Sequence, residues 1–129
     1  IINNPQGSLE KKYLRDTGKN MNTYVQVVTT TDSKEMAEKI ATTVIERQLA
    51  ACVQISNCLS MYRWQGEVEK TEEFLCVMKS RMDLFPDLES AIRSVHSYEV
   101  PEIIATEIKA GSNDYLAWLE QEIRPEGKG

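Results

Sequence analysis

The stretch from His96 to Glu102 holds the side chains that are best suited to chemistry. It contains the only histidine of the chain, a tyrosine, two carboxylates and a proline within seven residues. Neutral imidazole and carboxylate groups are ligands that suit zinc, copper or nickel. His96 and Glu102 are therefore candidate ligands for a divalent metal, although no cofactor is expected to be required. If residues 97–102 are extended, the two side chains lie up to about 20 Å apart, so such a site would close only where subunits meet.

A purely structural interpretation of this stretch stays open. His96 would then end a helix, where the negative end of the helix dipole favours a protonated imidazole, and Glu102 would only hydrate the edge of a strand. A single histidine without a second histidine or a cysteine at ligand spacing is a weak signal for a metal. Both interpretations place the stretch at a junction between a helix and a strand.

Catalytic motifs are absent from the sequence. It has no Gly-x-Ser-x-Gly, no phosphate-binding loop and no dinucleotide fingerprint, and residues 23–124 contain only two glycines. A nucleophile made of His96 and a cysteine ranks last among the alternatives. The three cysteines are odd in number and lack metal-site spacing, which favours core or interface positions in a reducing compartment, the cytoplasm: Cys52, Cys58 and Cys76. We expect a protein that is not an enzyme.

Charge and hydropathy limit the partners. The net charge is −5, but the first 22 residues carry +2, so the remainder carries −7. An acidic surface repels phosphate backbones, which argues against nucleic acid and favours divalent cations. No apolar run approaches the roughly 20 residues needed to cross a bilayer, so a membrane partner is not expected.

The 129 residues fit one domain between residues 23 and 124. Residues 1–22 have neither an apolar core nor a cleavage site typical of a signal peptide. Residues 1–22 are expected to form a disordered leader. Met21 precedes the first convincing strand, so we interpret it as a native initiator and the twenty residues before it as a segment of foreign origin. Residues 125–129 are expected to form a flexible tail.

The order of the predicted elements indicates the fold class. Strands are predicted where β-branched and aromatic residues concentrate, and helices where apolar residues recur every three or four positions. The expected strands cover residues 24–31, 51–64, 67–79 and 103–108, and the expected helices cover 33–48, 83–96 and 112–123. Asp32 is a candidate N-cap of the first helix, and Asn57 interrupts an apolar face, which indicates a bulge or bend. This order predicts an α+β, ferredoxin-like β-α-β-β-α-β sandwich with an antiparallel sheet, a long central hairpin and a C-terminal helix.

Aromatic residues near the hairpin turn indicate assembly. Tyr62, Trp64, Tyr98 and Trp118 have large amphipathic rings of the kind that is enriched at protein interfaces. Trp64 adjoins the Gln65-Gly66 turn, where a small domain offers little to bury it. A long two-stranded hairpin is marginally stable alone, so we expect it to contact a neighbouring subunit.

Four blocks in order show that residues 24–123 resemble the CutA divalent-cation-tolerance family. They are Leu49-Ala-Ala-Cys52, Tyr62-Arg-Trp-Gln-Gly-Glu67, His96-Ser-Tyr-Glu-Val-Pro-Glu102 and Tyr115-Leu-Ala-Trp118-Leu. The resemblance implies a ferredoxin-like fold in a tight homotrimer whose hairpin strands continue sheets across subunits. It also implies a link to tolerance of copper and other divalent cations.

The resemblance also implies site residues. The family's proposed metal groups are a cysteine at the end of the first strand, the junction histidine and a nearby glutamate, which correspond to Thr29, His96 and Glu102. Thr29 departs from the cysteine-bearing members, and the loss of a thiolate is expected to weaken copper(I) binding in particular. Ser97 replaces a proline that is frequent in the family, so the rigidity of this loop differs.

Two functional hypotheses follow. In the first, the protein is a trimeric metal-homeostasis protein that binds copper, zinc or a similar ion weakly at His96 and Glu102 near subunit interfaces. In the second, it is a trimeric signalling or scaffolding module, related in architecture to PII-type regulators, that binds a small molecule or a protein in its clefts. Thr29, Tyr62, Trp64, Tyr98 and Trp118 are the candidate cleft or interface residues.

Overall fold

A computed structural model describes residues 23–125 of the chain. The expectations of a disordered leader over 1–22 and, apart from Pro125, of a flexible tail lie outside these residues. None of the helices within residues 23–125 has the length and apolar character required to cross a bilayer.

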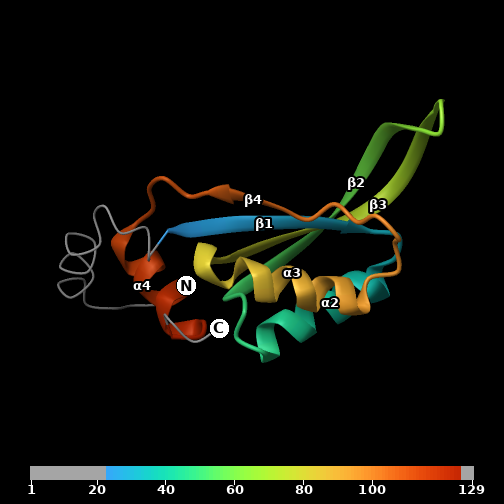
Figure 1. The fold of residues 1–129 in the computed structure, drawn as a ribbon. Coiled ribbons are helices and arrows are strands. Elements are labelled where there is room, and N and C mark those ends of the chain that lie inside the picture. The colour runs from blue at the N-terminus through green and yellow to red at the C-terminus, as the bar shows by residue number, and fades with distance from the viewer. Residues whose placement is uncertain (1–22, 126–129) are drawn as a thin grey trace.

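The described chain alternates strands and helices in the expected order (Figure 1). A 3₁₀ turn over Met82–Leu84 leads directly into the helix Phe85–Val95, so this helix begins two residues later than Asp83 would suggest. The elements are β1 (Tyr24–Thr31), α2 (Lys34–Glu46), β2 (Cys52–Trp64), β3 (Glu67–Arg81), η1 (Met82–Leu84), α3 (Phe85–Val95), β4 (Ile104–Glu107) and α4 (Asn113–Glu122).

The four strands form one sheet in the order β2-β3-β1-β4, and each neighbouring pair is antiparallel. Helices α2 and α3 cover one face of this sheet, and α4 lies at the end where β1 begins (Figure 1). This arrangement confirms the predicted α+β, ferredoxin-like fold with its long hairpin and C-terminal helix.

The core forms where the helices meet the covered face of the sheet. Apolar residues of α2 and α3 pack against alternate residues of β1 and β3, including the buried Cys76. Burial raises the pKa of the Cys76 thiol to about 11, so it stays a neutral, apolar group in the core. Ser33, rather than Asp32, caps α2, since its hydroxyl accepts a hydrogen bond from the Met36 amide at 3.1 Å.

The β2-β3 hairpin is a continuous ladder from Cys52 opposite Lys79 to Trp64 opposite Glu67. Gln65 and Gly66 both have positive φ, 52° and 84°, the signature of a two-residue turn that suits the twist of the strands. Asn57 pairs in register with Phe74, so the predicted bulge is wrong.

The interruption at Asn57 has another cause. Before it, Val53 and Ile55 are half-buried on the helix side; beyond it, Leu59 and Met61 on that side are exposed. Cys58 and Ser60, on the opposite side, are half-buried instead. The strand therefore stays regular, but the face that is partly buried changes at Asn57. The helix side becomes exposed because the hairpin projects beyond the helices (Figure 1).

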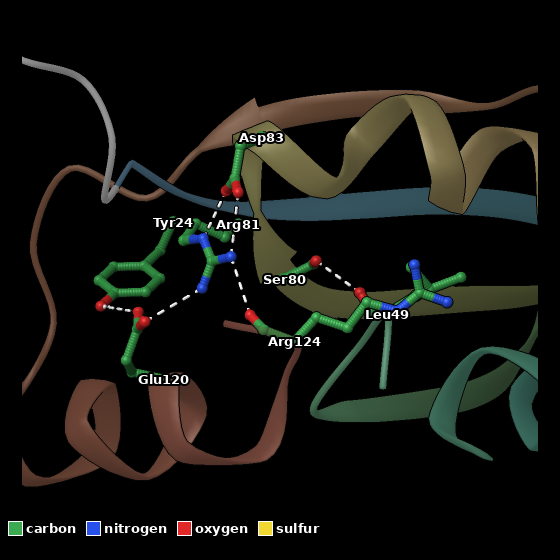
Figure 2. Close-up of polar contacts among 7 residues, drawn as sticks. All are labelled: Tyr24, Leu49, Ser80, Arg81, Asp83, Glu120 and Arg124. Atoms are coloured by element: carbon green, nitrogen blue, oxygen red, sulfur yellow. Dashed lines mark hydrogen bonds and ion pairs between the residues drawn. The ribbon is translucent and has the colours of Figure 1, made fainter. Parts of the chain in front are cut away.

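A buried arginine fastens α4 to the end of the sheet (Figure 2). The Arg81 side chain has no exposed surface, and its guanidinium donates to both carboxylate oxygens of Asp83, with 3.0 Å for Nη2 to Oδ2. It also donates to Glu120 at 3.0 Å and to the Arg124 carbonyl at 2.9 Å. Tyr24 donates its hydroxyl to the other oxygen of Glu120 at 2.7 Å. One cation thus holds three segments of the chain together.

Replacing Arg81 with methionine is expected to lower the free energy of unfolding by about 3 kcal/mol, because removing one partner of a buried ion pair leaves the other charges uncompensated. The measurement is chemical unfolding at one fixed protein concentration. Arg93→Met is the matched control, since Arg93 and Glu89 form an exposed pair one helical turn apart, and its loss is expected to cost no more than about 0.5 kcal/mol. Equal losses in the two variants would contradict the role assigned to Arg81.

Candidate functional site

His96 lies at the C-terminal end of α3, and its imidazole is hydrogen-bonded on both sides. Nε2 lies 2.9 Å from the Thr30 carbonyl oxygen and 3.3 Å from the Thr29 hydroxyl. Nδ1 accepts a hydrogen bond from the Tyr98 amide at 3.1 Å. Because Nδ1 is an acceptor, the hydrogen of the neutral ring is on Nε2, which donates to Thr30.

The surroundings of His96 favour this neutral form. Burial lowers the pKa of the imidazole below its usual value, and the Thr30 carbonyl and the carboxylates of Asp32 and Glu73 only partly oppose that effect. A protonated ring would also place a hydrogen on Nδ1, facing the Tyr98 amide hydrogen. His96 ends the helix as expected, but as a neutral link between β1 and the following loop.

Tyr98 continues this link toward the hairpin. Its ring packs against that of His96 with centroids 4.9 Å apart, and its hydroxyl donates to Glu73 Oε2 at 2.6 Å. Ser60 donates to the other oxygen of Glu73, also at 2.6 Å. These are short distances of the kind found when a hydroxyl donates to a carboxylate. Burial, and then the hydrogen bond to Glu73, raise the pKa of Tyr98, so the phenol remains a donor.

A groove of about 1010 Å³ opens between the outer part of the hairpin and the loop that follows His96. We call it the hairpin groove. Its aromatic walls are Tyr62, Trp64 and Tyr98, and its carboxylates are Glu69, Glu73, Glu99 and Glu102. The lining residues include no lysine or arginine. The groove is therefore both aromatic and anionic.

Most of the candidate residues lie in this region, but they do not form a single site. Thr29 is buried and contacts His96 behind the groove. The hairpin residues Tyr62 and Trp64 line the groove together with Tyr98 and Glu102. Trp118 lies apart from them on α4, where its ring packs against Tyr115 with centroids 5.5 Å apart.

A metal ion would find no preformed site in residues 23–125. No group of three or more histidine, cysteine, aspartate or glutamate residues in this part of the chain could hold a metal ion. Both nitrogens of His96 are engaged in hydrogen bonds, and Glu102 is exposed at the groove. Metal binding to His96 by one subunit would have to break a hydrogen bond to the backbone.

Two residues of the site, Glu73 and Ser60, were not predicted from the sequence. The signal for Glu73 was available, because the two-residue turn at Gln65-Gly66 sets a register in which it lies opposite Cys58. That places its carboxylate next to the Ser60 side chain on the same face. The contact with Tyr98 could not be read in this way, since it joins residues 25 positions apart through the tertiary fold.

Comparison with known proteins decides the family. Residues 25–122 match the family described as "CutA1 divalent ion tolerance protein". The chain belongs to this family. The "Divalent-cation tolerance protein CutA" of Thermus thermophilus is 44% identical over 96 residues, which cover 74% of this chain and 93% of that protein. The human "Protein CutA" is 41% identical, and the matched part covers 71% of this chain but 52% of the human protein.

Solved structures of CutA1 proteins have the same fold. The divalent cation tolerance protein from Thermus thermophilus superposes with a TM-score of 0.76 at 40% identity, covering 78% of this chain and 99% of that one. The CutA1 structure from Oryza sativa gives a TM-score of 0.77 at 36% identity, covering 82% and 98%. The resemblance noted from the four sequence blocks is thereby confirmed for this CutA1 chain.

The lowered pKa of His96 predicts a loss of stability in mild acid. The unfolded chain binds a proton near the ordinary histidine pKa of about 6.5, whereas the folded chain resists protonation. Stability from this residue is therefore present above that pH and is lost as the pH falls below it. The free energy of unfolding is expected to fall more steeply between about pH 7.5 and about pH 5.5 in the wild type than in His96→Gln, whose side chain stays neutral. Parallel curves for the two proteins would contradict this prediction.

Proposed function

We propose that this CutA1 protein acts as a homotrimer in divalent-cation tolerance, through weak binding of copper, zinc or a similar ion near the subunit interfaces. Residues 23–124 form the functional domain in this proposal, and no catalytic step is involved. The family match supports the role in tolerance. Three free cysteines support a reducing, cytoplasmic location, although relatives are named chloroplastic in Arabidopsis thaliana and periplasmic in Archaeoglobus fulgidus.

The β2-β3 hairpin has two features that favour assembly with other copies of the chain. Its outer half exposes large apolar side chains, with Leu59 58%, Trp64 49% and Val68 64% exposed. Leu59 and Val68 lie on one face of the hairpin and Trp64 on the other, and large exposed apolar surface of this kind marks an interaction site. Strand β2 is also an edge strand of 13 residues, which leaves unpaired backbone groups along one side. A second copy that covers this strand would satisfy both, and the number three follows from the family resemblance.

The surroundings of His96 favour weak rather than tight binding of a cation. His96 can act as a ligand only by giving up a backbone hydrogen bond, and Glu102 is the exposed carboxylate in the same loop. The remaining ligands would have to come from water or a neighbouring subunit, since residues 23–125 offer no third group beside them. Thr29 contributes a hydroxyl where a thiolate would favour copper(I).

The second candidate function, a PII-like module that binds a small molecule or a protein, is supported by the size of the hairpin groove. Pockets for small molecules commonly have volumes of about 300–1,000 Å³ and aromatic walls with a few polar groups, a description that fits this groove.

Titration calorimetry with copper(II) and with zinc tests the cation site. His96→Ala and Glu102→Gln are each expected to weaken binding at least about tenfold, a typical effect of altering a metal site. Glu107→Gln is the matched control, because it removes the same charge from an exposed residue on β4. The site would be refuted by affinities that are equal in all four proteins.

Sedimentation equilibrium tests the assembly. The expected mass is three times the chain mass of 14.7 kDa. Trp64→Glu is expected to reduce this mass by placing a charge in the proposed contact, whereas Met82→Glu, on η1 away from the hairpin, is expected to leave it unchanged. A wild-type monomer at micromolar concentration would overturn the proposal.

A further inference from the structure

The two ring nitrogens of His96 differ in their access to an ion. Nε2 lies 2.9 Å from the Thr30 carbonyl oxygen and 3.3 Å from the Thr29 hydroxyl, and both threonines are buried in β1. Nδ1 faces the loop that follows α3 and accepts a hydrogen bond from the Tyr98 amide at 3.1 Å. In the neutral ring Nδ1 also carries the lone pair that a metal needs, because the hydrogen is on Nε2. Nδ1 is therefore the nitrogen through which His96 can act as a ligand.

The imidazole of His96 already has the orientation of a metal-binding histidine. Histidines that bind a metal through one nitrogen commonly donate the other N–H to a backbone carbonyl, which fixes the tautomer and the ring. Nε2 of His96 donates in this way to the Thr30 carbonyl. The Tyr98 amide thus occupies the position that a cation would take, and it is the group that a cation must displace.

The Tyr98 side chain holds this amide in place. Its ring packs against the imidazole of His96 with centroids 4.9 Å apart, and its hydroxyl donates to Glu73 on β3 at 2.6 Å. Glu73 is only 7% exposed, and Ser60 on β2 donates to its other oxygen at 2.6 Å. A hydrogen bond to a carboxylate is roughly twice as strong as one between neutral groups. The Tyr98 amide is therefore anchored to the β2-β3 ladder.

The first residues of the loop have few other restraints. Ser97 contacts Asp32 through an exposed, longer hydrogen bond of 3.4 Å. Pro101 is buried at the far end of this segment, so a displacement of residues 97–100 leaves Glu102 in place. The bond between the Tyr98 hydroxyl and the hairpin is the shortest of those that hold the segment closed.

We propose that Tyr98 is a gate for the cation site at His96. In the closed form its amide occupies Nδ1 and its hydroxyl is bonded to Glu73. In the open form residues 97–100 move away, and Nδ1 is free for a divalent cation. This inference rests on the proposed function and adds to it the residue that limits the affinity. All the contacts involved lie within one chain, so the gate does not require the outer hairpin to be uncovered.

A zinc titration of the intact protein, followed through the nitrogen-15 signals of the imidazole, tests which nitrogen is used. His96 is the only histidine of the chain, so both ring signals are assigned without ambiguity. The metal-free protein is expected to carry the ring hydrogen on Nε2. Zinc is expected to change the Nδ1 signal while Nε2 keeps its hydrogen, and a zinc ion bound at Nε2 would overturn the proposal.

Tyr98→Phe tests the gate itself, because it removes the hydroxyl but retains the ring and the amide. A closed form lowers the apparent affinity by the fraction of protein that is open, so zinc is expected to bind this variant about fivefold more tightly. Removal of a residue with a structural role alone would weaken binding or leave it unchanged.

Tyr62→Phe is the matched control. It removes a hydroxyl from a neighbouring tyrosine of the hairpin, whose hydrogen-bond partner at 3.1 Å is Thr71 and not Glu73. Its affinity for zinc is expected to stay within about twofold of the wild type, since the opening of the loop is unaffected. An equal gain in the two variants would contradict the role of the Tyr98 hydroxyl.

Hydrogen exchange measures the same opening in the metal-free protein. The amide of residue 98 exchanges when it leaves Nδ1, so Tyr98→Phe is expected to raise its rate about fivefold, by the same factor as the zinc affinity. The amides of β1 serve as the internal reference and are expected to keep their rates. An equal rise in β1 would show a general loss of stability and would rule out the gate.

Failure of the gate and failure of the proposed function give different results. If zinc binds the wild type, is lost in His96→Ala and binds Tyr98→Phe no more tightly, the gate is wrong and the cation site stands. If zinc binds at His96 in none of these proteins, the cation site is wrong and the gate falls with it.

Discussion

The continuous register of the β2-β3 ladder is the constraint on which the rest of the site depends. A two-residue turn at Gln65-Gly66 sets that register, and thirteen residue pairs follow from it without interruption. Because side chains alternate between faces, a slip of β3 by one residue would move Glu73 to the helix side of the sheet, away from Ser60. The same slip would expose Cys76 and Met78, which form part of the core. Core burial therefore maintains the register that orients the groove.

A chain of polar contacts connects this ladder to the centre of the sheet. It runs from Ser60 through Glu73 and Tyr98 to His96 and ends at the Thr30 carbonyl of β1. Each member donates to the next or accepts from it, so the loop after α3 is held although it has no regular secondary structure. In this chain His96 positions Tyr98, and Tyr98 forms one wall of the hairpin groove. His96 thus has a structural role, and a cation that binds its ring must replace one of these hydrogen bonds. Any cation binding at His96 is therefore expected to be weak.

The two ends of the sheet differ in how far their side chains are buried. At one end, Arg81 is buried and compensated by Asp83 and Glu120, so α4 closes the core (Figure 2). At the other end, the hairpin projects beyond the helices and leaves apolar and acidic side chains uncovered (Figure 1). The two hydrophobic clusters therefore lie where helices cover the sheet, and the large exposed apolar side chains of the hairpin lie beyond them.

The sequence by itself determined the order of the elements, the apolar stripes of α2 and α3, the turn at Gln65-Gly66 and the family, because these depend on local periodicity and on short motifs. The prediction of Asp32 as N-cap was wrong, because Ser33, one position later, accepts the capping hydrogen bond. The predicted bulge at Asn57 was also wrong, because the apolar alternation of β2 stops where the helices no longer cover the sheet. Only the tertiary structure decided that His96 is neutral and hydrogen-bonded at both nitrogens, that Thr29 contacts it, and that Glu73 is buried beside Tyr98. Apart from the local bond between the Tyr98 amide and His96, those contacts join residues 25 to 67 positions apart, and their chemistry depends on burial, which no local pattern encodes.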